Sequence, residues 1–128
     1  MTEIGDSPRI VLVVEDDALV RYSVVELIEA EGFEVLEARD ADDALSLLEE
    51  CSEDVAVLFT DINMPGSMDG RDLMRVVADR WPHIIPFMTS GRAYVSDSTI
   101  PSPGRFFIKP YQVTEIAAAF RAVSRRTG

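Results

Sequence analysis

The chain has 128 residues, a length typical of one globular domain. Its 23 acidic and 12 basic residues give a formal charge of −11, which argues against binding to the phosphate backbone of nucleic acid. Apolar residues make up 47% of the chain and suffice for a core, but no apolar run approaches the ~20 residues that span a bilayer.

The start of the chain is polar and acidic, so residues 1–8 are expected to form a loose tail rather than a signal peptide. Cys51 is the only cysteine and cannot form an internal disulfide. Both features favour a cytoplasmic protein.

Five short runs bounded by turn residues predict strands, and the first and third are continuously apolar, as is typical of buried strands. The five runs lie at residues 9–14, 33–37, 55–60, 84–89 and 105–108. Apolar residues at helical spacing predict a helix after each of the first three runs and after the last. Asp40 and Asp69 are expected to cap the second and third of these helices, and Gly32 and Pro82 to end the first and third.

The segment between the fourth and fifth runs departs from this rhythm. Residues 93–100 show no helical stripe, and Pro101 and Pro103 follow at once. A short or irregular fourth helix is predicted here. The alternation of strands and helices otherwise indicates an α/β fold, a doubly wound parallel sheet formed by residues 9–126.

Polar side chains stand where the predicted strands end. Glu15 and Asp16 follow the first strand, Asp61 the third, Thr89 ends the fourth, and Lys109 follows the fifth. Because the carboxyl ends of parallel strands share one edge, these side chains are expected to converge. Three neighbouring carboxylates repel one another unless a cation lies among them, and an all-oxygen set selects a hard ion such as Mg²⁺.

Each of these residues also has a purely structural reading. The acids after the first strand are able to cap a helix, and this is the role expected of Asp17. Lys109 fits a solvated strand end and Thr89 an ordinary strand position. Their convergence on Asp61 favours a functional site.

Four motifs at these strand ends resemble the receiver domain of bacterial two-component response regulators. They are Val13-Val14-Glu15-Asp16-Asp17, Thr60-Asp61-Ile62-Asn63-Met64-Pro65, Met88-Thr89-Ser90 and Ile108-Lys109-Pro110-Tyr111. The resemblance covers nearly the whole chain. It implies a five-stranded, flavodoxin-like sheet of order 2-1-3-4-5, either as a stand-alone protein or as part of a hybrid kinase.

By this resemblance Asp61 is the phosphoacceptor, and Mg²⁺ is held by Glu15, Asp16, Asp61 and the backbone carbonyl of Asn63. Lys109 contacts the phosphoryl group.

The same resemblance assigns further phosphoryl contacts to the Thr89 hydroxyl and to the Ser90 backbone N–H. Thr89 and Phe106 then form the switch that reports phosphorylation. Plain core packing is the alternative for Phe106.

The implied partners are a sensor histidine kinase or a histidine phosphotransfer protein, and an unknown downstream protein. A homodimer is also compatible with the resemblance. The only expected chemistry is Mg²⁺-dependent self-phosphorylation and slow self-dephosphorylation, not turnover of an independent substrate. The main alternative is an interaction module with a receiver-like fold that works without phosphorylation.

Other functions fit less well. A phosphohydrolase with an aspartyl nucleophile typically has a second acid two residues further on, where this chain has Asn63. A phosphohistidine carrier would have to use His83, the only histidine, in a Trp-Pro-His loop. A flavodoxin-type cofactor binder needs a phosphate-cradling loop after the first strand, and Glu15-Asp16-Asp17 has the wrong charge for it.

Overall fold

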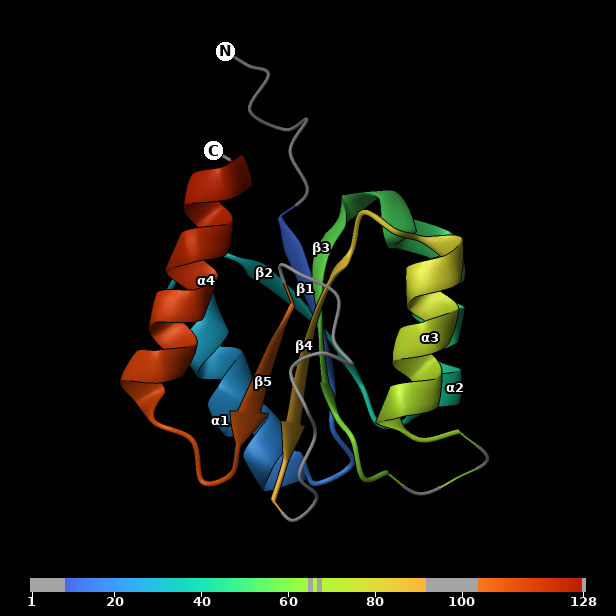
Figure 1. Cartoon of the computed structure of the whole chain (residues 1–128), viewed down its shortest axis with the longest axis horizontal. Coiled ribbons are helices and arrows are strands. Elements are labelled where there is room, and N and C mark those ends of the chain that lie inside the picture. The colour runs from blue at the N-terminus through green and yellow to red at the C-terminus, as the bar shows by residue number, and fades with distance from the viewer. Residues whose placement is uncertain (1–8, 65, 67, 92–103, 128) are drawn as a thin grey trace.

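A computed structural model describes residues 9–64, 66, 68–91 and 104–127, with side chains described as far as Ser124. A parallel five-stranded sheet of order β2-β1-β3-β4-β5 lies between two layers of helices (Figure 1). The elements in chain order are β1 (Ile10–Val14), α1 (Ala18–Glu29), β2 (Glu34–Ala38), α2 (Ala41–Cys51), the short η2 (Ser52–Asp54), β3 (Val55–Asp61), α3 (Gly70–Arg80), β4 (Ile85–Ser90), β5 (Arg105–Ile108) and α4 (Val113–Thr127).

The predicted α/β class and strand order are confirmed, and all five strands lie within a residue of their predicted ends. The expected end of the first helix is shifted. α1 ends at Glu29 and Gly32 follows two residues after its C-cap, with a φ of 94° that favours glycine. The predicted tail at 1–8 and the irregular helix expected before Pro101 fall outside the described residues.

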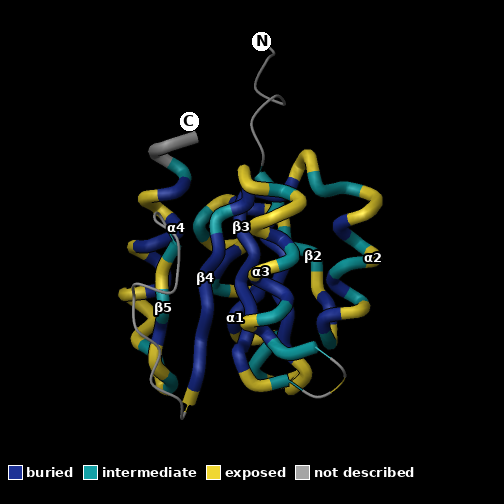
Figure 2. The backbone as a smooth tube through the Cα atoms, turned by 45° about the vertical axis from the view of Figure 1, so that its right-hand side comes forward, coloured by how far each residue is buried: buried dark blue, intermediate teal, exposed yellow. Residues whose placement is uncertain are grey.

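The two faces of the sheet are buried by different helices. Alternate residues of a strand point to opposite faces, so Val11 and Val13 pack toward α1 and α4 while Leu12 and Val14 pack toward α2 and α3. Figure 2 shows the inner strands β1, β3 and β4 as a buried layer, while the edge strands β2 and β5 are partly exposed and the exposed residues of the helices lie on their outer sides. Burial on both faces explains why β1 and β3 read as continuous apolar runs.

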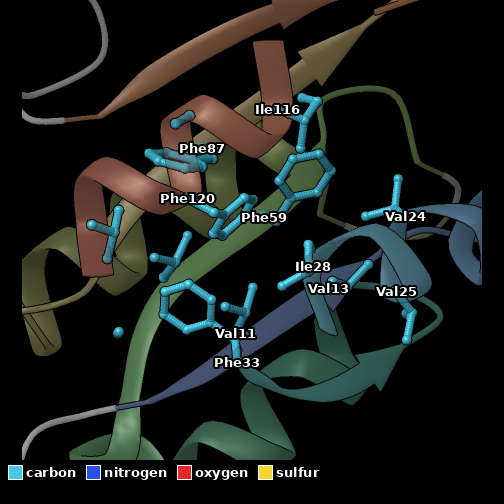
Figure 3. Close-up of a cluster of buried hydrophobic side chains, with 14 of the residues drawn as sticks. Val11, Val13, Val24, Val25, Ile28, Phe33, Phe59, Phe87, Ile116 and Phe120 are labelled. Carbon is cyan, nitrogen blue, oxygen red and sulfur yellow. The ribbon is translucent and has the colours of Figure 1, made fainter. Parts of the chain in front are cut away.

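Aromatic rings concentrate on the α1 and α4 face. Phe87 and Phe120 approach with ring centroids 5.0 Å apart, and Phe33 meets Phe120 edge-on at 5.6 Å. Figure 3 shows these rings beside Phe59 and the apolar residues of α1. This packing holds β1, β3 and β4 against the helices and makes a firm base for the residues at their carboxyl ends.

Carboxylates begin three helices. Asp17, Asp40 and Asp69 each accept backbone N–H bonds at the N-termini of α1, α2 and α3, which confirms the three predicted caps. In α3 the cap is reciprocal, because Asp72 accepts a bond from the Asp69 N–H in return.

Candidate functional site

The strand ends converge as predicted. Asp61 is the last residue of β3, Thr89 and Ser90 end β4, and Glu15 and Lys109 directly follow β1 and β5. In Figure 1 this edge lies at the bottom, where the strand arrowheads point. The strand order reverses between the adjacent strands β1 and β3, so the acids at their ends lie at the topological switch point where open α/β sheets bind ligands.

Asp61 is buried, with 7% of its surface exposed. Its Oδ2 accepts a bond from the Lys109 ammonium at 2.8 Å, and its Oδ1 accepts one from the Asn63 backbone N–H at 3.1 Å. The carboxylate is therefore held by two donors in a defined orientation, and it lies at the end of a strand buried along its whole length.

Lys109 joins two acids. Its Nζ also lies 3.3 Å from Glu15 Oε1, and its own backbone N–H donates to the Ser90 carbonyl at 2.9 Å. Burial acts to lower the pKa of Lys109, but the bond to Asp61 and the charge of Glu15 outweigh it, so the pKa is raised. The side chain therefore remains an ammonium at neutral pH.

Glu15 is the second buried acid, with 6% of its surface exposed. Burial raises its pKa above the ordinary value of 4.5, although the Asp17 N–H and Lys109 both stabilise the carboxylate. Oxygens of Glu15, Asp16 and Asp61 all lie within 4.8 Å of one another. Two buried carboxylates and an exposed one, with a single ammonium among them, form a donor set that fits a hard divalent cation.

The end of β4 closes another side of the site. Thr89 lies opposite Asp61 in the register of β3 and β4, and its carbonyl accepts the Ile62 N–H at 2.9 Å. The Asn63 side chain donates to the Ser90 hydroxyl at 3.2 Å. Thr89 and Ser90 are both fully buried, and Asn63 is exposed at the rim.

Phe106 lies on β5, beside Met88 in the register with β4. It is half-buried and packs against Ile62, Met74 and Met88. Its ring is thus close to the residue that follows Asp61, but it belongs to the packing around the site and not to its polar groups.

Gly70 was missed by the sequence reasoning. A Cβ at this first residue of α3 would overlap the carbonyl oxygen of Asp61 and lie 2.8 Å from Ile62 Cα. The Gly70 N–H also donates to the Ile62 carbonyl at 2.9 Å. α3 therefore begins in direct backbone contact with the strand that ends in Asp61. The signal available was a glycine directly after a capping aspartate, where a better helix former is usual.

An apolar groove opens beside Lys109. Its volume is about 480 Å³, and its lining residues come from α1 and from the segment that joins β5 to α4: Val20, Ser23, Val24, Leu27, Lys109, Pro110, Tyr111 and Val113. Burial raises the pKa of Tyr111, so its phenol stays neutral at physiological pH. Leu19 and Tyr22 on α1 are 80% and 63% exposed.

None of the described helices is long and apolar enough to cross a membrane. The fold and the polar edge define a doubly wound α/β domain with an acidic pocket at the switch point of its sheet. Within that class the chain belongs to the response regulator receiver domain family, whose model matches residues 11–121.

Characterised relatives support this membership. The transcriptional regulatory protein PdtaR of Mycobacterium tuberculosis is 31% identical over 122 residues, which cover 92% of this chain and 58% of PdtaR. The sensor kinase CckA of Brucella abortus is 32% identical over 116 residues, 87% of this chain and 12% of CckA. The chain thus spans little more than half of the first relative and a small part of the second.

Solved structures agree. The receiver domain of the hybrid histidine kinase CckA superposes with a TM-score of 0.76 at 29% identity, covering 89% of this chain and 97% of that one. A receiver domain from Clostridium thermocellum gives a TM-score of 0.80 at 22% identity, covering 91% and 94%, a likeness that concerns the fold alone. The predicted family is confirmed.

Proposed function

We propose that this domain receives a phosphoryl group on Asp61 from the phosphohistidine of a sensor histidine kinase or a histidine phosphotransfer protein. The observation that carries the proposal is the environment of Asp61, a buried carboxylate bonded to an ammonium at 2.8 Å and within 4.8 Å of two further acids. A cytoplasmic location belongs to the same proposal.

The transfer is a displacement at phosphorus. An Asp61 carboxylate oxygen forms the new O–P bond while the P–N bond of the phosphohistidine breaks, and the imidazole leaves with the electron pair. The acceptor and the phosphoryl group are both anionic, so their approach needs compensating positive charge. Lys109 supplies it from 2.8 Å, as a compact ammonium that is able to follow an Asp61 oxygen or a phosphoryl oxygen.

Glu15, Asp16, Asp61 and the carbonyl of Asn63 are the residues that would hold Mg²⁺. The bound ion supplies charge neutralisation for the phosphoryl oxygens and orients them for transfer. The chain's own contribution is to hold two of these acids buried, with the Asp17 N–H fixing Glu15 at 3.0 Å and the Asn63 N–H fixing Asp61 at 3.1 Å.

The switch follows from the position of Thr89. Its hydroxyl and the Ser90 N–H are the donors assigned to the phosphoryl group, and both residues lie at the end of β4 next to Asp61. A new charge-assisted bond from Thr89 would draw the end of β4 toward Asp61. Phe106, which packs on Met88 from the adjacent strand, is the residue assigned to pass that shift to a downstream protein.

We propose that the protein that donates the phosphoryl group binds at the groove beside Lys109. Any protein that delivers a phosphohistidine to Asp61 must approach this edge, and Lys109 belongs to both the pocket and the groove. The groove and the exposed Leu19 and Tyr22 offer an apolar surface that an amphipathic helix of the donor would cover.

The test is intact-mass spectrometry after incubation with Mg²⁺ and acetyl phosphate or phosphoramidate. One phosphoryl adduct is expected on the wild type, and none on Asp61→Asn or when Mg²⁺ is chelated. If the phosphoryl adduct is too short-lived to detect, calorimetry measures the binding of beryllofluoride in the presence of Mg²⁺ instead. If the wild type neither gains mass nor binds beryllofluoride, the domain is a phosphorylation-independent interaction module instead.

A further inference from the structure

Arg21 on α1 bonds to the backbone of Glu15, one of the acids of the pocket. Its NH1 donates to the backbone carbonyl of Glu15 at 2.7 Å, and its Nε donates to Glu37 Oε1 on β2 at 3.0 Å. The Arg21 side chain is 17% exposed, so these bonds are partly shielded from water. One guanidinium thus joins α1, β2 and the residue that follows β1.

With the bond from Arg21, both backbone polar groups of Glu15 are hydrogen-bonded. The Glu15 N–H donates to the Ala38 carbonyl at 3.1 Å, and its carbonyl is the acceptor for Arg21. Both main-chain groups are therefore occupied at the point where the chain turns from β1 into α1. The carboxylate is not used by either bond and faces Lys109 and the Asp17 N–H.

We propose that Arg21 is a positioning residue for the metal pocket: by fixing the Glu15 carbonyl it sets the direction of the Glu15 and Asp16 side chains. The inference rests on the proposed function in that it assigns Mg²⁺ to these acids. Arginine suits the task because its planar fork binds two acceptors at once, whereas lysine is a point charge. Groups behind the ligands of a metal site typically change its affinity by about 10- to 100-fold when removed.

The sign of the effect separates this role from a purely electrostatic one. Arg21 carries a positive charge near the pocket, so its removal should strengthen cation binding if charge is all that matters. Loss of positioning weakens binding instead. A merely structural role for Arg21 in packing α1 would lower stability and leave the affinity of the folded molecule for Mg²⁺ unchanged.

The experiment is a titration of the isotope-labelled protein with Mg²⁺ alone, followed by amide NMR well below the unfolding temperature. Arg21→Met is expected to weaken Mg²⁺ binding about tenfold. Arg21→Lys is expected to lose nearly as much, because it restores the charge but not the fork. Unchanged or tighter binding in Arg21→Met, or full recovery in Arg21→Lys, would overturn the inference.

Two control variants isolate the Glu15 contact. Glu37→Gln removes the ion pair, whose glutamate is half exposed, but leaves the bond from Arg21 to the Glu15 carbonyl, so the affinity of this variant for Mg²⁺ should stay within about twofold of the wild type. Arg121→Met removes the same charge from the ion pair with Glu31 beyond the other end of α1, and should change nothing. An Arg121→Met loss equal to that of Arg21→Met would contradict positioning.

A metal-free measurement keeps the two proposals distinct. In EDTA, amide exchange at Glu15 and Asp17 should speed up in Arg21→Met, while exchange at Asp61 is unaffected. If the wild type fails to bind Mg²⁺ but this exchange pattern appears, the proposed phosphoryl chemistry fails and the positioning of the turn stands. Equal exchange at Glu15 in both proteins would refute the positioning.

Discussion

The two ends of the sheet carry ion pairs in opposite environments. At the amino end Arg80 and Glu49 meet at 2.6 Å, with side chains 44% and 54% exposed. At the carboxyl end Lys109 meets Asp61 at 2.8 Å, with side chains 25% and 9% exposed. The chemistry of the contact is similar, but water screens one pair and is largely excluded from the other.

This difference separates a surface contact from the candidate functional site. Exposed pairs contribute little to stability because both charges are well solvated without each other. Buried charges are costly, and here two buried carboxylates share one ammonium. The carboxyl end therefore holds uncompensated negative charge in a rigid frame, which favours the binding of a cation.

The largest effect is expected at Gly70. Gly70→Ala forces a methyl group into the Asp61 carbonyl and should cost about 3 kcal/mol in the free energy of unfolding, because backbone cannot move aside as a side chain does. Urea denaturation measures it. Gly91→Ala is the control: its Cβ would lie 3.7 Å from Lys109 Cβ, an ordinary contact, and should be nearly neutral. Equal costs for the two would show that the contact at Gly70 is relaxed.

The second-largest effect on stability is expected from the removal of Lys109. Lys109→Met leaves Glu15 and Asp61 without their shared ammonium and should lower the free energy of unfolding by about 2 kcal/mol in EDTA, less than for a fully buried pair because Lys109 is partly exposed. Mg²⁺ should restore part of the loss. Arg121→Met, which breaks the pair with Glu31, serves as the comparison. A loss no greater than in that variant would remove the contrast between the two ends.

Glu15 gives a pH-dependent test. Because burial raises its folded-state pKa, Glu15 stabilises the fold below its ordinary value of 4.5 and loses that contribution as pH rises through the folded value. Glu15→Gln should therefore melt at a higher temperature than the wild type in EDTA at pH 7, with the gap closing toward pH 4.5. Its Mg²⁺ binding should weaken. If the wild type instead melts at a higher temperature than Glu15→Gln at pH 7, burial of the Glu15 carboxylate does not destabilise the fold.

The smallest effect is expected from the same chemical change at the other end. Glu49→Gln should alter the free energy of unfolding by less than about 0.5 kcal/mol, because Glu49 is half exposed and its partner Arg80 keeps its stacking on Trp81. High salt should erase even that difference. Thermal melts in low and high salt provide the measurement, and a salt-resistant loss would mean that the amino-end pair is stronger than its exposure suggests.

Much of the fold was predictable because burial on both faces leaves a clear pattern in the sequence. The inner strands β1 and β3 are apolar runs, and the acids at their carboxyl ends stand out against them. Parallel pairing then brings Asp61, Glu15 and Lys109 together without knowledge of any loop. The edge of the sheet that carries the polar site followed from parallel pairing, and the strand order from the family resemblance.

Gly70 and Arg21 were not predictable in the same way. Each contacts a backbone carbonyl of a residue outside its own helix. Because every residue has a carbonyl, the sequence does not show which one is contacted. Arg21 on α1 looks like any charged helix residue until the fold places β2 and the end of β1 around it. Asn63 is similar, since its side-chain bond to Ser90 depends on how β3 and β4 end side by side.

The central claim is that Asp61, and no other acid of the pocket, accepts the phosphoryl group. Borohydride reduces an aspartyl phosphate to homoserine, so treatment of the protein phosphorylated by acetyl phosphate and Mg²⁺ marks the acceptor permanently. Peptide mass mapping should find homoserine at position 61 alone. Homoserine at Asp16, or at neither position while the intact protein carries phosphate, would contradict the account.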